Sequence, residues 1–155
     1  MTRPSSMPMR QFDRSLPMAL LRAREAVMKK FSPALKAHDL SPQQWRVIRV
    51  LVEEDELDAT EIAERCALLL PSLSRILQNL HKRGLVSRKT ASSDQRRSIV
   101  SITARGRKLF RTLSPVNEAR YAYITQKFGY GKLELLYELL NELVEKIDED
   151  EGDAP

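Results

Sequence analysis

Residues 70–103 constrain the fold of this chain most, because a helical pattern there runs directly into a strand pattern. In LPSLSRILQNLHKRGL, the apolar side chains recur at i, i+3, i+4 and i+7, a spacing that predicts one buried face of an α-helix. These side chains are Leu73, Ile76, Leu77 and Leu80. Pro71 fits the first helical position, and Gly84 fits the position just beyond the last turn. We therefore expect a helix that starts at a proline and ends at a glycine.

The opposite face of this predicted helix is polar. At about 100° per residue, a stripe of hydrogen-bonding side chains runs along it. The stripe consists of Ser72, Ser74, Arg75, Gln78, Asn79 and Lys82. Arginine, glutamine and asparagine match the edges of bases, whereas serine and lysine more often meet phosphates. Leu70 offers no oxygen to cap the first N–H groups, which leaves them able to receive a phosphate. These features predict a DNA recognition helix.

Two short strand-like segments follow, at residues 86–90 (VSRKT) and 98–102 (SIVSI). The polar loop ASSDQRR joins them, which predicts a β-hairpin with a basic tip. A helix followed by such a hairpin is typical of a winged helix-turn-helix. In that arrangement, Arg88, Lys89 and Arg97 would fix the register of the protein on phosphates.

Positive charge is concentrated in this part of the chain. Residues 71–111 hold eleven lysines and arginines against one acid, Asp94, although the whole chain has a net charge of only +5. Acidic blocks at residues 53–64 and 134–153 supply the balance, so the basic surface is local. A solvated basic surface is the alternative, but charges on one helix face and at a hairpin tip together favour nucleic acid. The basic residues are Arg75, Lys82, Arg83, Arg88, Lys89, Arg96, Arg97, Arg105, Arg107, Lys108 and Arg111.

The segments before residue 70 complete a helix-turn-helix. We expect a flexible arm over residues 1–14 and a first helix over residues 16–38, which Pro33 kinks or interrupts. A second helix, PQQWRVIRVLVE, begins at a capping box formed by Ser41 and Gln44. The polar connection EEDELD then leads to a short third helix, ATEIAERC. That helix is capped by Asp58, with Glu61 three residues on.

The segments after the hairpin are two long helices. Thr103 caps the first of them, which Ser114 and Pro115 should kink or break. The second covers residues 132–150, and a disordered tail follows at residues 151–155. Its apolar residues recur at coiled-coil spacing, with acidic residues outside. They are Leu133, Leu136, Tyr137, Leu140, Leu143, Val144 and Ile147.

This pattern predicts a mainly α fold with a small β-wing. Residues 41–103 form a winged helix-turn-helix DNA-binding domain, and residues 15–40 and 104–150 form dimerisation helices. The last helix either packs in the core of its own subunit or pairs with a second subunit. Because the winged domain is complete without it, we expect a homodimer.

Composition argues against several other classes of protein. The single cysteine, Cys66, rules out an internal disulfide and fits a reducing cytoplasm. Its thiol is either a buried structural group, which its helical position favours, or a redox sensor. Two histidines, no glycine-rich phosphate loop and no metal-ligand cluster argue against an enzyme, a metal site or a cofactor. No apolar run approaches the roughly 18 residues of a membrane span, so we expect a cytoplasmic protein.

The first two predicted helices carry cations and a ring that suggest a ligand site. Arg24 and His38 fall inside the apolar stripe of the first helix. Arg24 then meets either an internal carboxylate or a ligand carboxylate, while His38 is either structural or part of the same site. Trp45 faces inward, and Arg49 beside it is either a stem packed on the core or half of an anion pocket. Arg46 is more exposed, and it is either a surface residue or closes such a pocket from its rim.

The wing carries Asp94-Gln95-Arg96 followed by Ile102-Thr103. This motif resembles the D-x-R-x(5)-L-T pattern of the MarR family of dimeric winged-helix regulators, with isoleucine in place of leucine. The order of the predicted helices resembles that family as well. The resemblance implies that Arg96 enters the minor groove of double-stranded DNA and that Asp94 holds the loop through a salt bridge.

Three further segments, ALLRAREAVMKKF, LSPQQWRVIRVL and LLPSLSRIL, are similar to the regulators of homoprotocatechuate (4-hydroxyphenylacetate) degradation operons. That resemblance implies a repressor relieved by an aromatic acid, bound between the dimer helices and the winged domain. Arg24, Trp45 and Arg49 would lie there, with Met28 on the ring side. An arginine for the carboxylate and a tryptophan for the ring suit an aromatic carboxylate. A different effector, a redox input, or a non-specific architectural DNA-binding protein are the alternatives.

Overall fold

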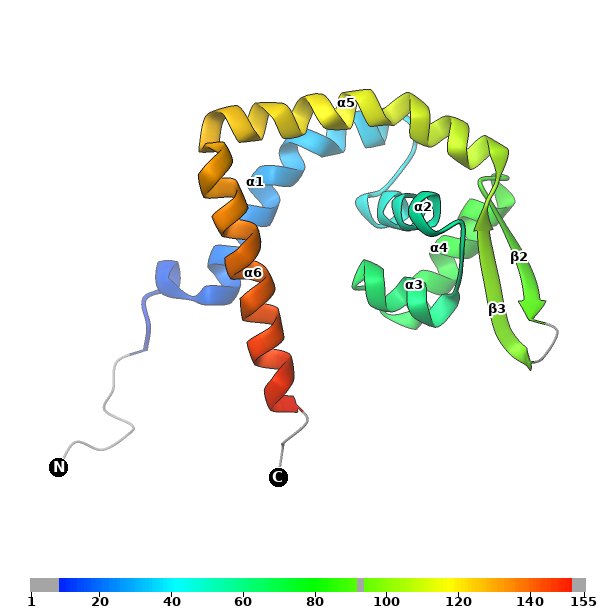
Figure 1. Ribbon diagram of the computed structural model, residues 1–155, viewed down its shortest axis with the longest axis horizontal. Coiled ribbons are helices and arrows are strands. Elements are labelled where there is room, and N and C mark those ends of the chain that lie inside the picture. The colour runs from blue at the N-terminus through cyan, green and yellow to red at the C-terminus, as the bar shows by residue number, and fades with distance from the viewer. Residues whose placement is uncertain (1–8, 92–93, 152–155) are drawn as a thin grey trace. The chain divides into compact units, whose positions relative to one another are not determined.

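The computed structural model describes residues 9–91 and 94–151, and at residues 91, 94–96, 150 and 151 it describes the backbone alone. Figure 1 shows the elements in chain order. They are a 3-10 helix η2 (Phe12–Arg14), α1 (Leu16–Ala37), α2 (Pro42–Glu54), β1 (Glu56–Asp58), α3 (Ala59–Cys66), α4 (Leu70–Lys82), β2 (Val86–Ala91), β3 (Asp94–Ile102), α5 (Ala104–Phe128) and α6 (Tyr130–Glu151). The chain divides into two compact units within α5, between Leu113 and Ser114. The predicted mainly α fold with a small β-wing is confirmed.

Residues Phe12–Arg14, predicted to belong to the flexible arm, form one turn of 3-10 helix, η2. The Arg22 guanidinium donates a hydrogen bond to Asp13 Oδ1 at 2.7 Å and lies 5.7 Å from the centre of the Phe12 ring. These contacts tie η2 to α1. Residues 1–8 of the predicted flexible arm lie outside the described residues, as do residues 152–155 of the predicted tail.

Both predicted capping boxes are present and fix where α2 and α3 begin. The Gln44 amide N–H donates to Ser41 Oγ at 3.1 Å, and the Ser41 N–H donates to Gln44 Oε1 at 2.9 Å. At α3, the Glu61 N–H donates to Asp58 Oδ1 at 2.8 Å. Each box satisfies N–H groups that the first helical turn leaves without a partner.

Hydrogen bonds to backbone groups also fix where α4 ends and where α5 begins, on either side of the hairpin. Gly84 has a positive φ of 74° and ends α4, with the Leu85 N–H donating to the Leu80 carbonyl at 2.9 Å. Thr103 Oγ1 accepts from the Gly106 N–H at 3.0 Å, which caps α5 as predicted. The same hydroxyl donates to the Gly84 carbonyl at 2.7 Å and so joins the start of α5 to the end of α4.

The sheet has three antiparallel strands in the order β1-β3-β2. The prediction that EEDELD is only a polar connection is wrong, because Glu56–Asp58 forms β1 and Leu57 pairs with Val100 of β3. Three residues, two of them acidic, are too few to show an alternating pattern. The strands of the hairpin also extend further into the predicted loop than the pattern indicated.

Neither Pro33 nor Pro115 interrupts its helix, while the kink predicted as the other outcome stays a prediction. Both prolines lie inside continuous helices, α1 and α5. A proline removes one backbone hydrogen bond, but tertiary packing of the flanking turns offsets that loss. Leu35 follows Pro33 and is 1% exposed, while Leu113 precedes Pro115 and is 2% exposed.

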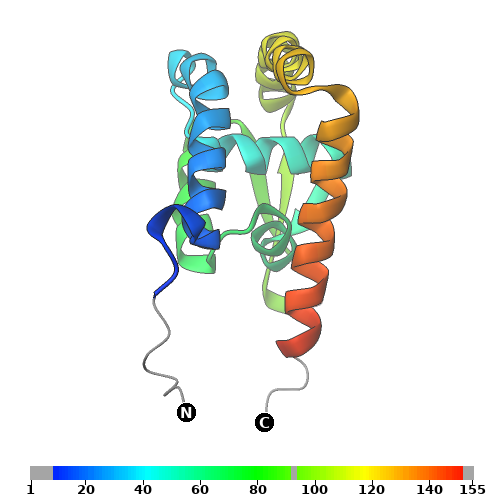
Figure 2. The same ribbon diagram turned by 90° about the vertical axis from the view of Figure 1, so that its left-hand side faces the viewer.

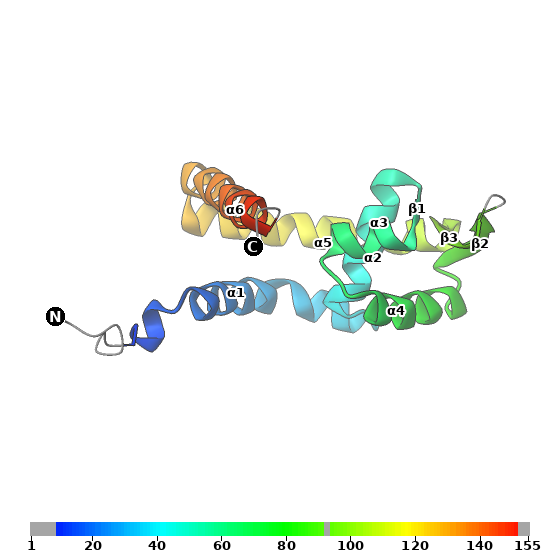
Figure 3. The same ribbon diagram turned by 90° about the horizontal axis from the view of Figure 1, so that it is seen from below.

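The core of the first unit forms where α2, α3 and α4 gather beside the hairpin (Figure 3). Ile48, Ile62 and Leu77 are buried from these three helices. Trp45 of α2 stacks on Phe110 of α5, with ring centres 5.6 Å apart and planes 17° apart. The core therefore holds α4 rigidly by its apolar side and leaves its other side to solvent.

In the second unit, α6 runs without a break (Figure 2). Several of its apolar side chains are exposed, among them Val144 at 57% and Ile147 at 53%. Within the described residues, no helix has both the length and the apolar character needed to cross a bilayer.

Candidate nucleic-acid interface and ligand site

The polar stripe predicted for the recognition helix lies on the exposed side of α4. Leu73, Leu77 and Leu80 are buried on the opposite side. The exposed side chains are Ser72, Ser74, Arg75, Gln78, Asn79 and Lys82. The helix begins one residue earlier than predicted, after Leu69, and no side chain caps its first turn. Its amphipathic character is therefore confirmed, while contact with DNA stays a prediction.

Asn79 of this stripe is held by a side chain from α2. Gln44 Nε2 donates to Asn79 Oδ1 at 2.9 Å. Because Gln44 Oε1 also accepts from the Ser41 N–H, one glutamine joins the capping box of α2 to the polar face of α4. The bond occupies the oxygen of Asn79 and restricts its rotamers.

Two cations of the wing lie close to acidic side chains of β1. Arg97 Nε donates to Asp58 Oδ2 at 3.1 Å, and Lys89 Nζ lies 3.9 Å from Glu56 Oε2. A phosphate would therefore compete with Asp58 for Arg97, whereas Arg88 is exposed on β2. The side chains of Asp94, Gln95 and Arg96 lie outside the described residues, so their predicted roles stay predictions.

Asp58 has a lowered pKa. The main cause is the hydrogen bond from the Glu61 backbone N–H, and the Arg97 guanidinium lowers the pKa further, while burial raises it. An ionised Asp58 can cap α3 and hold Arg97 at the same time.

Of the side chains predicted to bind an effector, Arg46 and Arg49 line one cavity and His38 lines another. Trp45 is buried at 6% exposure against Phe110, as its inward position predicted. Arg46 is partly buried, not a surface residue, because its Nη1 donates to the Cys66 carbonyl at 2.7 Å and closes the end of α3. Arg46 and Arg49 line a cavity of about 190 Å³ beside Cys66.

The helical period places Arg24 and His38 in the apolar stripe of α1, but both are exposed in the single chain, so the stripe is not buried at these two positions. The Arg24 side chain is 50% exposed and donates to Glu25 at 3.2 Å. The apolar period of α1 continues over the whole helix, but only Phe31 and Leu35 are buried. Met28 is partly buried.

Cys66 is a buried free thiol, as predicted. Burial raises the pKa of this thiol, and the nearby charges of Arg46 and Arg65 lower it by less. A raised pKa keeps the thiol protonated and therefore poorly reactive. This environment favours the structural role over the redox sensor.

Arg83 is a structural cation that the sequence pattern did not identify. Its Nη1 donates to the Asp39 carbonyl at 2.8 Å, and its Nη2 donates to the His38 carbonyl at 3.2 Å. The side chain thus satisfies the last carbonyls after α1 and ties α1 to the end of α4. The only signal in the sequence is a basic residue beside Gly84, which is too common to assign a partner 44 residues away.

Comparison with known proteins matches residues 38–98 to the MarR family model. The chain is 40% identical over 137 residues to the HTH-type transcriptional regulator FarR of Neisseria gonorrhoeae, covering 88% of this chain and 94% of FarR. It is 38% identical over 141 residues to the homoprotocatechuate degradative operon repressor of Escherichia coli, covering 91% and 95%. The crystal structure of NadR in complex with 4-hydroxyphenylacetate is 41% identical, with a TM-score of 0.76 over 88% of this chain and 97% of NadR. These matches confirm the resemblance inferred from the wing motif and the first helices.

Proposed function

This chain belongs to the MarR family, and we propose that it is a homodimeric DNA-binding repressor of an operon for aromatic-acid breakdown. An aromatic carboxylate would relieve the repression. One observation carries the DNA-binding part of this proposal. The polar stripe of α4 is exposed along its whole length, while the leucines on the other side of the helix are buried.

In the proposed complex, α4 lies in the major groove. Arg75 and Gln78 read base edges, because both side chains offer the paired hydrogen bonds that distinguish bases there. Ser72, Ser74 and Lys82 meet phosphates and set the register. Arg96 of the wing enters the adjacent minor groove. Two such subunits would read half-sites about 10–10.5 bp apart, one turn of the duplex.

The exposed apolar side chains of α6 support the dimer. A helix with Val144 and Ile147 more than half exposed presents apolar surface that a second subunit would cover. The coiled-coil spacing of its apolar residues suits pairing of helix with helix.

For the effector, we propose an aromatic carboxylate of the kind bound by NadR. Trp45 supplies a flat apolar ring beside Phe110, and Arg24 or Arg49 supplies a cation for the carboxylate. Arg46 donates to the Cys66 carbonyl and is partly buried, whereas Arg24 and Arg49 are exposed. Such a ligand would act by binding more tightly to the dimer whose recognition helices no longer match the groove.

Competition binding tests the DNA part of the proposal. Full-length protein would be titrated onto DNA from its own upstream region, with an excess of unrelated DNA. We expect a complex that unrelated DNA does not displace, and Arg75→Ala to weaken it by about 1–3 kcal/mol. Arg120→Ala, which removes an exposed cation of α5, serves as the matched control. Equal displacement by any DNA would instead indicate an architectural protein.

A further inference from the structure

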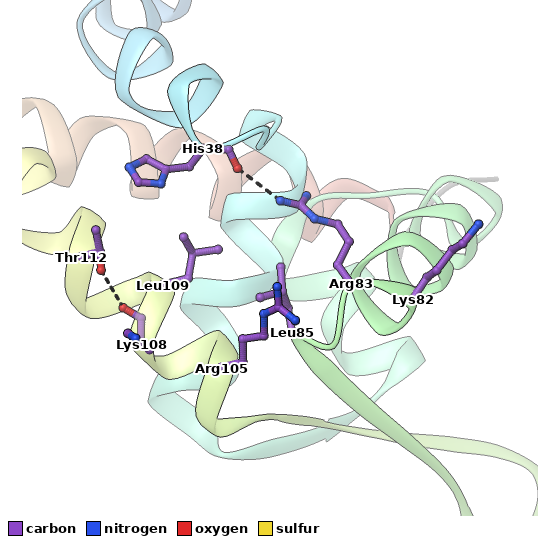
Figure 4. Close-up of a pocket in the computed structure, with 8 residues that line it drawn as sticks. All are labelled: His38, Lys82, Arg83, Leu85, Arg105, Lys108, Leu109 and Thr112. Carbon is purple, nitrogen blue, oxygen red and sulfur yellow. Dashed lines mark hydrogen bonds between the residues drawn. The ribbon is translucent and has the colours of Figure 1, made fainter.

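A basic cavity of about 500 Å³ lies at the Gly84 end of α4 (Figure 4). Its walls come from the end of α1, the end of α4 and the start of α5. The Gly84 end of α4 adjoins the base of the hairpin, at the end opposite its tip, as Figure 1 shows. Neither Trp45 nor Arg49 lines the cavity. It shares two lining side chains with the residues considered above, Lys82 from the proposed phosphate contacts and His38 from the predicted effector residues.

The charges that line the cavity are all positive. Lys82 and Arg83 come from the end of α4, and Arg105 and Lys108 come from the first turns of α5. His38 adds an imidazole, and none of the lining residues is acidic. Arg105 and Lys108 are three residues apart on one helix, so their side chains share a face.

These cations lack the carboxylate partners that other cations of the same unit have. Arg65 pairs with Glu54, Arg97 pairs with Asp58, and Arg107 pairs with Asp55. Over the described part of the chain, by contrast, no carboxylate forms an ion pair with Lys82, Arg105 or Lys108. The donors of Arg83 reach backbone carbonyls, which leave its charge uncompensated.

The floor between the two pairs of cations is apolar. Leu85, which is 4% exposed, and Leu109 form it. In Figure 4, the Arg105 side chain lies beside Leu85, and the His38 ring lies across from Leu109. The absence of a side chain at Gly84 leaves room for Arg105, whose Nη1 is 3.7 Å from the place a Cβ would occupy. A volume of this size falls in the range of small-molecule sites, about 300–1,000 Å³.

We propose that this cavity binds a small organic dianion, with one acidic group at the α4 cations, the other at the α5 cations, and an apolar frame over Leu85 and Leu109. A monoanion would pair with the cations of only one helix, either α4 or α5. A dianion bound in this cavity would contact both α4 and α5. The inference concerns binding alone and does not depend on the aromatic effector proposed above.

Isothermal titration calorimetry with terephthalate as the dianion and benzoate as the matched monoanion tests this proposal. The full-length protein would be saturated with 4-hydroxyphenylacetate, so that an effector site is already filled. The test variant is Arg105→Gln with Lys108→Gln. The control variant is Arg111→Gln with Arg120→Gln, which removes two exposed cations of the same helix outside the cavity.

We expect terephthalate to bind the wild type and the control variant alike, and the test variant about ten-fold more weakly or not at all. Benzoate should bind all three poorly. Equal binding to all three proteins, no binding to any, or equal affinity for benzoate and terephthalate would overturn the proposal. A test variant that loses DNA binding without any dianion, while the control keeps it, would assign the cavity to DNA phosphates instead.

Discussion

Asp58 shows how one carboxylate can serve several elements. It ends β1, caps α3 and pairs with Arg97 at the base of the wing. The cap of α3 and the pair with Arg97 favour the ionised form, and they hold the pKa of Asp58 below its usual value.

This lowered pKa predicts a pH dependence of stability. A carboxylate whose pKa is lower in the folded state stabilises the fold above the pKa of the unfolded chain and loses that effect as the pH falls. Asp58→Asn keeps a good N-cap but does not titrate. We expect the wild type to melt above the variant at pH 7, and the gap to close below about pH 4. Thermal melts over a pH series measure it, and a gap that is constant down to pH 2 would contradict the assignment.

Gly106 is required by close packing, although it lies in a helix. A Cβ there would meet the Leu85 carbonyl oxygen and would come within 2.5 Å of Ile102 Cδ1. Alanine normally stabilises a helix interior by about 1 kcal/mol relative to glycine. At Gly106 we expect the opposite, a loss of about 1–3 kcal/mol, because the core cannot accept the extra carbon.

The control for that substitution is Gly131→Ala in α6. A Cβ at Gly131 meets nothing within 4 Å, so alanine should keep or raise the melting temperature. Chemical denaturation of both variants separates packing from helix propensity. A Gly106→Ala variant as stable as the wild type would contradict the close packing of Gly106 against Leu85 and Ile102.

At the scale of elements, the polar face of α4 depends on α2 through Gln44. Glutamate at this position keeps the capping box but has no N–H to donate to Asn79. We expect Gln44→Glu to melt near the wild type yet to bind specific DNA about three- to ten-fold more weakly. Gln43→Glu adds the same charge one residue away, where no bond to Asn79 exists in the structure. Equal loss in both variants would mean that repulsion of phosphates, and not the hydrogen bond, is responsible.

Element boundaries followed from local chemistry wherever a side chain itself satisfies a backbone group. The caps at Ser41, Asp58 and Thr103, and the turn at Gly84, could be predicted because each depends on residues at most five positions apart. The strand β1 could not, since its pairing with Val100 is made across 43 residues. That the helices continue through Pro33 and Pro115 could not be predicted for a similar reason, because the packing that holds them together is tertiary.

The same distinction between local and tertiary contacts applies to the candidate site. The polar stripe of α4 follows from periodicity alone, so its exposure could be predicted. The partners of Arg46, Arg83 and Arg97 are a carbonyl or a carboxylate on another element, and no spacing in the sequence identifies them. The exposure of Arg24 also depends on how far the core extends along α1, which the period of a helix does not indicate.

At the scale of the whole molecule, the proposed dimer depends on the apolar face of α6. Covering a valine or isoleucine side chain fully contributes about 1.5–3 kcal/mol. We expect Val144→Glu with Ile147→Glu to reduce the mass in sedimentation equilibrium from two chains to one. Asn141→Glu with Lys146→Gln makes the same change in net charge on polar positions of α6, and it should stay dimeric. A monomeric wild type would refute this role of the helix.

The measurement that tests the central claim most directly is a titration of the specific protein–DNA complex with 4-hydroxyphenylacetate, followed by fluorescence anisotropy of labelled DNA. The account predicts that the acid releases the DNA from the wild type, and that Arg49→Ala requires a higher concentration of acid for the same release. Phenol, which has the ring but no carboxylate, should release little. A complex that persists at saturating concentrations of the acid would contradict the claim that an aromatic carboxylate relieves repression.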